Sequence, residues 1–382
     1  GDYVRVVEEF LEPVHSTVLL DRVWRHSGGC PPPHVGKSPA RRLPGFFSEK
    51  IGVPVYPFES PNFLPSAKNK QVNLVRSVAY NLFRLHKYLS SIRYINRMIK
   101  ETGADVVVNF YELLTGLTYL FCHPKALMVC IAHQYLFLHP DFVFPGQNRL
   151  SLVSLKFFTR MTAIGATKKL ALSFRKMREV PSERIVVVPP LLRKEVLETT
   201  PVNGDYLHGY LLNSGFSEEI RSWHKVHPNV ALHIFWDKKE VRPEVKVDSF
   251  LSFHQLNDTL FIRYMAGAKA YATTAGFESV CEAMYLGKPV LMVPTHIEQS
   301  CNAFDAVQAG AGVVADRFDL DALLELSRTH RPNPAFSHWV KQADWLILRE
   351  FRPDLLMEET PASLWRRLST RWIYRLGKTL SI

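Results

Sequence analysis

The sequence has few cysteines, and none of the spacings that cysteines take in metal sites. Its five cysteines are scattered and form no C-x-x-C pair, which argues against a zinc site or a disulfide framework. It contains no uncharged apolar run of about eighteen residues, so no membrane-spanning helix is expected. It also lacks an internal repeat and a low-complexity tract. These absences predict a globular protein of the cytoplasm, without a bound metal or cofactor.

Acidic residues are fewer than basic ones, 36 against 47, and the formal net charge is +11. Such an excess favours an anionic partner: a nucleotide, a phospholipid surface or a nucleic acid. We expect no nucleic acid, because no recognition motif accompanies the charge. The cations gather in a tail at 365–378, beside aromatic residues, and in a helical stretch that contains Arg76, Arg84, His86, Lys87, Arg93, Arg97 and Lys100.

Two interpretations of these basic regions stay open. Cations beside Trp and Tyr suit the headgroup and acyl boundary of an anionic membrane, so the protein could bind peripherally at its inner face. Alternatively, the tail packs back on the first half of the chain and its charges are solvated.

The 382 residues are enough for two domains, and strands alternate with helices along the chain. An amphipathic helix is expected at Val72–Thr102, and continuous apolar runs at Ala104–Phe110, Met128–His133 and Arg184–Val188 are typical of strands buried on both faces. A weaker strand signal occurs at Ser16–Leu20. These patterns predict an α/β protein built from parallel sheets.

A second alternating series follows the turn-rich segment Thr199–Gly204, where we place the domain boundary. Strands are expected at 206–212, 231–236, 270–273, 289–293 and 312–315, and helices at 217–225, 261–266, 279–286 and 303–310. The predicted division is an N-terminal domain at 1–198, a C-terminal domain at 205–345, and C-terminal helices at 346–382.

The richest chemistry follows the strand at 270–273. Gly276 stands where the chain must turn tightly and approach a ligand, and glycine permits both. The next residues open a helix, whose free N–H groups and positive dipole end attract phosphate. Glu282 lies about one turn inside and could accept both hydroxyls of a ribose. A loop after Pro294 would present polar side chains to a sugar.

This combination, from about 206 to 315, resembles the C-terminal half of GT-B nucleotide-sugar glycosyltransferases. It is most similar to the branch that contains the peptidoglycan-precursor N-acetylglucosaminyltransferase and the UDP-glucuronosyltransferases. The resemblance implies that Glu282 binds ribose and that the diphosphate lies against Ala275, Gly276, Phe277, Glu278 and Ser279. It further implies that Glu298 and Gln299 contact the donor sugar, with Asn302 completing the motif.

The same resemblance assigns two more segments. The loop Phe253–Leu256, with His254 and Gln255, falls where the family holds uracil, largely through backbone contacts. Asn213, Ser214 and Gly215 match the family's turn beneath the phosphates. The resemblance implies two Rossmann-like domains with a cleft between them. It also implies an inverting transfer from a nucleoside-diphosphate sugar, with UDP the expected nucleotide, to an acceptor hydroxyl that could be lipid-linked. No D-x-D motif stands near the site, so metal-independent transfer is expected.

The N-terminus departs from the family pattern. A strand followed by a glycine-rich turn with a histidine is missing, since three prolines separate Ser27-Gly28-Gly29 from His34. Residues 1–35 are therefore expected to be divergent, rearranged or the product of a mistranslated start. In the last case the first sheet would lack its opening strand and the protein would be inactive.

The catalytic base is correspondingly unassigned, and two candidates follow apolar strands. His133 has a near-neutral ordinary pKa and could take a proton from the acceptor, or it could only hydrogen-bond a loop. Glu112 is the second candidate by position. Two other functions stay open: a sugar-nucleotide epimerase of the same fold, and a catalytically impaired nucleotide-sugar-binding protein.

Overall fold

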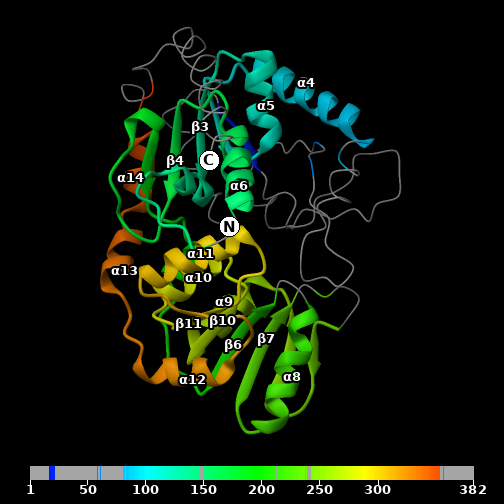
Figure 1. Ribbon diagram of the computed structural model, residues 1–382, viewed down its shortest axis with the longest axis vertical. Helices are drawn as coiled ribbons and strands as arrows, with labels where there is room; N and C mark the ends of the chain where they lie inside the picture. The colour runs from blue at the N-terminus through cyan, green and yellow to red at the C-terminus, as the bar shows by residue number, and fades with distance from the viewer. Residues whose placement is uncertain are drawn as a thin grey trace.

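The structure is a computed structural model that describes residues 17–21, 58, 61, 81, 83–146, 149–211, 214–236, 238, 242–352 and 356. It contains two sheets, one above the other in Figure 1. The first sheet is parallel, in the order β1-β2-β3-β4-β5. Its strands are β1 (Thr17–Asp21), β2 (Val106–Phe110), β3 (Leu127–Ala132), β4 (Lys168–Leu172) and β5 (Ile185–Val188).

The weak strand signal near the start of the chain is confirmed. Residues Thr17–Asp21 pair in parallel with β2, in register from Thr17 opposite Val106 to Asp21 opposite Phe110. The expectation that a defective N-terminus would leave the first sheet without an opening strand is therefore wrong. The segment Ser27–His34 lies outside the described residues.

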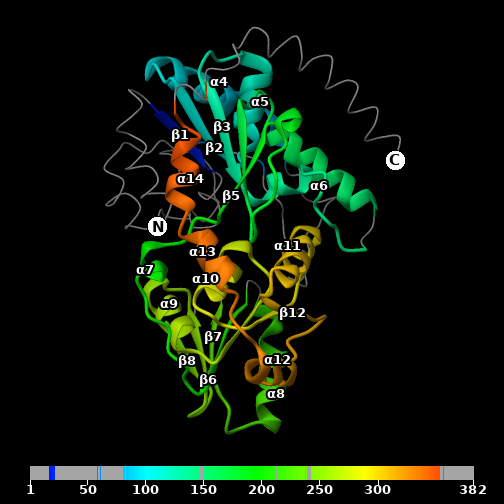
Figure 2. The same ribbon diagram turned by 90° about the vertical axis from the view of Figure 1, so that its left-hand side faces the viewer.

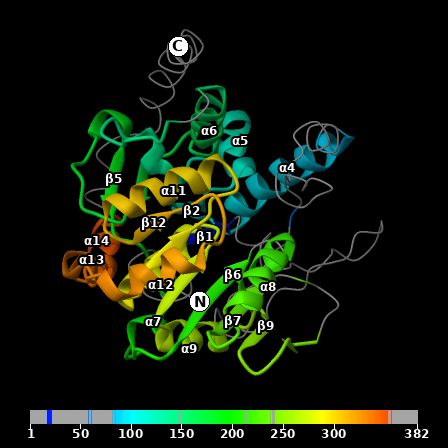
Figure 3. The ribbon, with the colours of Figure 1, turned by 60° about the horizontal axis from the view of Figure 1, so that its bottom comes forward.

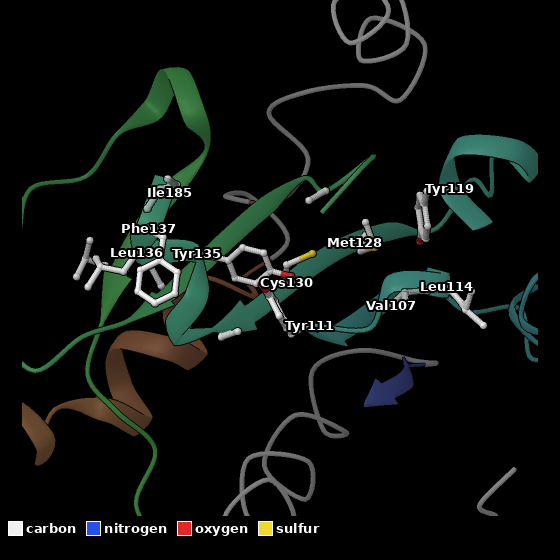
Figure 4. Close-up of a cluster of buried hydrophobic side chains, with 14 of the residues drawn as sticks. Val107, Tyr111, Leu114, Tyr119, Met128, Cys130, Tyr135, Leu136, Phe137 and Ile185 are labelled. Atoms are coloured by element: carbon white, nitrogen blue, oxygen red, sulfur yellow. The ribbon is translucent and has the colours of Figure 1, made fainter. Parts of the chain in front are cut away.

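Helices cover one face of the first sheet because their apolar side chains recur at helical spacing. In α4 (Leu85–Glu101), Ile92, Ile95 and Ile99 are buried, which confirms the described part of the predicted helix. They join a cluster with side chains of α5 (Leu113–Cys122) and the 3-10 helix η2 (His133–Leu138), shown in Figure 4. Helix α6 (Arg149–Thr162) crosses α5 so closely that a Cβ at Gly116 would meet the Met161 carbonyl oxygen at 2.1 Å.

The second sheet has the order β12-β11-β10-β6-β7-β9-β8 and is parallel except for β8. Its strands are β6 (Tyr206–Leu211), β7 (Ala231–Trp236), β8 (Glu244–Lys246), β9 (Leu251–Gln255), β10 (Ala270–Thr273), β11 (Val290–Met292) and β12 (Gly312–Val314). The predicted α/β class is thereby confirmed, and the five strands predicted in this half are present.

Helices cover both faces of the second sheet, as Figure 3 shows from its lower end. One face carries α8 (Ser217–Val226) and α12 (Leu320–Thr329). The other carries α7 (Lys194–Leu197), α9 (Asp258–Gly267), α10 (Phe277–Tyr285), α11 (Ile297–Gln308) and α13 (Pro334–Val340). Because both faces are covered, β10 and β11 are buried at every residue rather than at alternate ones.

Two sequence predictions in this half are wrong. Residues 253–255, expected in a loop, belong to β9, which is paired on both sides by β7 and β8. Helix α11 begins at Ile297 rather than at Ala303, so Glu298, Gln299 and Asn302 lie on a helix and not in the loop before it. Strand β4 and helix α6 were not anticipated from the sequence pattern.

Within the described residues, the chain crosses between the sheets twice. The first crossing runs from the end of β5 to the start of β6 and contains the expected boundary at Thr199–Gly204; the division into domains stays a prediction. The second runs through α13 into α14 (Ala343–Arg349), which lie one after the other along the left side of Figure 1 and face the viewer in Figure 2. There the Trp339 indole donates to the Ser173 carbonyl at 2.9 Å. Ala343 and Ile347 pack on the first sheet.

The described helices include none that is both long and apolar enough to cross a bilayer. The cationic tail at 365–378 and Arg76 lie outside the described residues.

A buried lysine forms a hydrogen bond with the segment of the first crossing. The Lys288 side chain is 1% exposed and its ammonium donates to the Val202 carbonyl at 2.7 Å. Burial lowers the pKa of Lys288 from 10.5 to about 8. Between those two values the unfolded chain holds a proton that the folded protein does not hold, so stability rises with pH there.

This gives a pH prediction. Relative to Lys288→Met, the unfolding free energy of the native protein should rise by about 3 kcal/mol from pH 8 to 10.5 and stay level below pH 8. Urea unfolding at a series of pH values measures the difference, and the variant cancels the titration of tyrosines and cysteines. A pH-independent difference would show that Lys288 keeps its ordinary pKa in the folded state.

Candidate functional site

The strand order of the second sheet reverses beside β6. Strand β6 has β7 on one side and β10 on the other, and later strands extend the sheet in both directions. In open parallel sheets such a switch point leaves a crevice at the carboxyl ends of the two strands. Strand β10 ends at Thr273, and the turn that follows it leads into α10. Helices α10 and α11 lie between the two sheets in Figures 1 and 2.

The turn after β10 is tight, but its strained residue is not the one expected. Ala275 has the left-handed φ of +63°, whereas Gly276 has φ −65° and ψ 131°. A Cβ at Gly276 would touch only the Ser279 hydroxyl, at 3.6 Å. Neither backbone conformation nor crowding therefore requires glycine at 276, and the backbone there is open to close approach by a ligand.

Helix α10 begins at this open position without a side-chain cap. The Ser279 hydroxyl donates to the Gly276 carbonyl at 3.2 Å, so it does not occupy the first amides of the helix. Phe277 and Ser279 are half-buried and Glu278 is exposed. An uncapped helix start carries unsatisfied N–H groups and a partial positive charge, which together bind phosphate oxygens.

Glu282, the expected ribose ligand, is buried one turn inside α10 and is paired. Both of its carboxylate oxygens accept from the Arg193 guanidinium at 2.6 Å. A further Arg193 nitrogen lies 3.6 Å from Asp258, at the start of α9. Burial raises the pKa of Glu282, and the charge and hydrogen bonds of Arg193 oppose that effect. Sequence reasoning missed Arg193, because nothing in its neighbourhood signals a partner 89 residues away.

The polar residues of α11 connect the turn with the first sheet. Glu298 accepts from the Gln134 side chain at 2.7 Å, across the two halves of the protein. The buried Gln299 accepts from the Thr295 amide at 2.8 Å and from its hydroxyl at 2.7 Å. Asn302 is buried beside the turn, its amide nitrogen 3.5 Å from the Ala275 carbonyl. The structure thus brings the three motif residues to the carboxyl end of β10.

His133 lies opposite this motif. It begins η2 at the end of β3, and its ring stacks on Phe277 with centroids 3.9 Å apart. Its Nδ1 donates to the Leu172 carbonyl at 2.8 Å, which leaves a lone pair on Nε2. Burial lowers the pKa of His133 to about 4, so the ring is neutral near pH 7. The side chain of Asn302 lies beside the ring, and neither Nε2 of His133 nor Oδ1 of Asn302 makes a hydrogen bond of good geometry within the described residues.

Glu112 has a local structural role. It is 1% exposed and caps α5, where its carboxylate accepts from the Leu114 amide at 3.1 Å. It stands at the end of β2, as expected, but capping already accounts for a carboxylate there. His133 is therefore the better placed candidate, because its ring stacks on Phe277, the first residue of α10.

The remaining predicted residues lie at neighbouring strand ends. His254 is buried in β9, and its Nε2 lies 3.2 Å from Nδ1 of His233 on β7. Its ring therefore faces His233 rather than the end of the strand. Gln255 is the last residue of β9. Ser214 and Gly215 begin the 3-10 turn after β6, and Asn213 lies outside the described residues. No group of three or more His, Cys, Asp or Glu suited to a metal ion occurs in the described ranges.

Comparison with known proteins agrees with this architecture. A curated relative, the putative UDP-glucuronosyltransferase ugt-48 of Caenorhabditis elegans, is 30% identical over 111 residues, which are 28% of this chain. The matched stretch spans only 19% of that relative's length. Among solved structures, the glycotransferase of kitacinnamycin superimposes with a TM-score of 0.52 at 12% identity, over 99% of this chain and 95% of the other.

A second solved structure, the UDP-GlcNAc 2-epimerase from Neisseria meningitidis, is 13% identical and has a TM-score of 0.46 over 69% of this chain and 80% of its own. The family pattern described as glycosyl transferase family 1 matches residues 62–326. Because that match spans more than half of the sequence and includes every strand of both sheets except β1, this chain has the GT-B fold and belongs to glycosyl transferase family 1.

Proposed function

We propose that this protein transfers a sugar from a UDP-sugar donor to an acceptor hydroxyl, with inversion at the anomeric carbon and without a metal ion. One observation carries the proposal: an uncapped helix start at the switch point of the second sheet, open at Gly276, with the carboxylate of Glu282 one turn further on. The amides suit a diphosphate and the carboxylate suits a ribose. The name of the curated relative supports uridine as the base.

The chemistry is a single displacement. The acceptor oxygen attacks the anomeric carbon, the bond from that carbon to the phosphate oxygen breaks, and UDP leaves with the bonding electrons. Attack from the side opposite the leaving group inverts the configuration. The acceptor proton passes to Nε2 of His133, which has a free lone pair and a neutral ring. The α10 amides stabilise the charge that develops on the diphosphate.

The acceptor side of the proposal rests on charge. The protein carries a formal net charge of +11, and Arg93, Arg97 and Lys100 lie exposed on α4. This supports a lipid-linked acceptor at an anionic membrane surface on the cytoplasmic side, reached by peripheral binding. Vesicles with and without anionic lipid test this part separately, because only electrostatic attachment is released by salt.

Calorimetry with UDP and a panel of UDP-sugars tests the donor site. Micromolar uptake of UDP compounds is expected, followed by UDP release only when an acceptor is added, with an inverted product by NMR and no loss of rate in EDTA. Absence of any uptake would refute the donor site. Conversion of the UDP-sugar without acceptor would identify an epimerase, and a rate abolished by EDTA and restored by Mg²⁺ would refute the metal-independent mechanism.

A further inference from the structure

Arg193 ties the candidate ribose ligand to the crossing between the sheets. It stands at the N-cap of α7, on the chain that leaves the first sheet. Its Nε and one terminal nitrogen each lie 2.6 Å from a different oxygen of Glu282, and the other terminal nitrogen lies 3.6 Å from Asp258. Both members of the pair are buried, with side chains 16% and 6% exposed.

The fork geometry leaves the carboxylate competent to bind. An ionised carboxylate has about four lone-pair sites, and a bidentate arginine takes one from each oxygen. The fork takes the two parallel lone pairs of the carboxylate, so one outward-pointing lone pair remains on each oxygen, in the plane that the guanidinium fixes. These two pairs diverge, and each can accept one hydroxyl, such as the 2′ hydroxyl of a ribose.

The surroundings of Glu282 would otherwise neutralise it. A carboxylate buried in apolar surroundings takes up a proton unless a cation faces it. The described ionisable groups that act on Glu282 are one cation, Arg193, two carboxylates and two neutral groups: Glu278, Asp258, Tyr271 and Cys281. A protonated Glu282 would lose one acceptor position to its own proton, so the charge of Arg193 decides whether both oxygens can accept a hydroxyl.

We propose that Arg193 is a positioning residue of the donor site: its guanidinium holds Glu282 ionised and oriented toward the ribose hydroxyls, and through Asp258 it fastens the segment after β9 that faces the base. This inference rests on the proposed function. Asp258 is 56% exposed, so its contact is the weaker of the two.

The test compares UDP with 2′-deoxy-UDP, because a residue that only stabilises the fold would weaken both equally. The native protein should bind UDP about 10 to 100 times more tightly, since one hydrogen bond to a charged group distinguishes the two. In Arg193→Met that preference should fall to within about threefold, as it should in Glu282→Gln. Arg193→Lys, which keeps the charge but not the fork, should be intermediate.

A pH series adds a second readout. Without the guanidinium, Glu282 stays protonated to higher pH, so the preference of Arg193→Met for UDP should return as pH rises from 6 to 9. The Glu282→Gln variant has no carboxylate and should show no such recovery. Arg328→Met is the matched control, because it removes an arginine from an exposed ion pair with Glu325 and should change neither affinity.

The outcomes separate this inference from the proposed function. If the native protein binds neither nucleotide, the donor site itself is wrong. If it prefers UDP and Arg193→Met keeps the native preference at every pH, or binds UDP more tightly than the native protein, the positioning role is wrong and the donor site stands. Equal native affinity for both nucleotides removes the ribose role of Glu282 and this inference with it. If Arg193→Met does not fold, Arg193→Lys provides the test: a reduced preference for UDP over 2′-deoxy-UDP supports the positioning role, and the native preference contradicts it.

Discussion

Gly276→Asp should abolish UDP binding while leaving the protein as stable as before, or slightly more stable. Gly276 is the N-cap of α10, with extended φ and ψ of −65° and 131° that an aspartate adopts without strain. The new Cβ meets only the Ser279 hydroxyl, at an ordinary 3.6 Å. The fold therefore gives no reason for the variant to be destabilised.

The added carboxylate acts directly on the proposed phosphate site. An N-cap aspartate accepts from the amides of the first helical turn, which stabilises the helix by about a few tenths of a kcal/mol relative to glycine. Those are the amides assigned to the diphosphate, and the new negative charge also repels it. Affinity for UDP should fall by at least about 100-fold, the effect of losing two or more charge-assisted hydrogen bonds.

Calorimetry and a thermal melt measure the two effects on one sample. Gln342→Asp is the control, because it adds the same charge at the start of α14, which also lacks a side-chain cap. It should leave UDP affinity unchanged. Gly276→Ala separates bulk from charge and should weaken binding less. An unaltered affinity in Gly276→Asp would place the diphosphate elsewhere and remove the central support for the proposed function.

His133→Ala should lower turnover by about 10² to 10⁴-fold, the usual contribution of a general base, with UDP affinity changed only a few-fold. Because the pKa of the folded-state imidazole is lowered to about 4, the ring is already neutral at pH 6. The rate should therefore stay level from pH 6 to 8 and fall only as the pH approaches 4, where the protonated ring cannot accept a proton.

His133→Asn distinguishes the catalytic role from a structural one. The asparagine amide can still donate toward the Leu172 carbonyl, as Nδ1 of His133 does, but it carries no basic nitrogen. If His133 has only a structural role, the asparagine variant should turn over normally. If His133 is the catalytic base, the variant should lose as much activity as His133→Ala. His338→Ala, an exposed histidine on α13, serves as the control for general effects of losing an imidazole.

The parts of this fold that sequence reasoning predicted are those that local pattern determines. The strand at 270–273 and the helix after it follow from an apolar run and a turn, and the structure places them within two residues of their predicted bounds. The start of α11 was missed because its cap is the His296 side chain, which accepts from the Gln299 amide at 3.5 Å. Histidine is not among the preferred cap residues, so no signal marked the boundary.

Long-range contacts limited the prediction of the site. The spacing of the sequence indicated a tight turn at Gly276 and a carboxylate of the site at Glu282, and the structure places both residues beside the switch point. The turn's strain falls on Ala275 because left-handed φ is set by how the turn closes, not by which residue permits it best. The pairing of Glu282 with Arg193 joins two elements 89 residues apart, and no periodicity encodes such a contact.

Two of the apolar clusters described above contain side chains from both halves of the protein. The cluster beneath the first sheet includes Cys301 of α11 and Trp339 of α13, and the cluster of the second sheet includes Phe174, which follows β4. A chimaera that exchanged one half for the matching half of another family member would replace only one side of each cluster. Mismatched side-chain volumes would then leave cavities where the two halves meet. A successful exchange therefore has to transfer each of these three side chains together with the half whose cluster it joins.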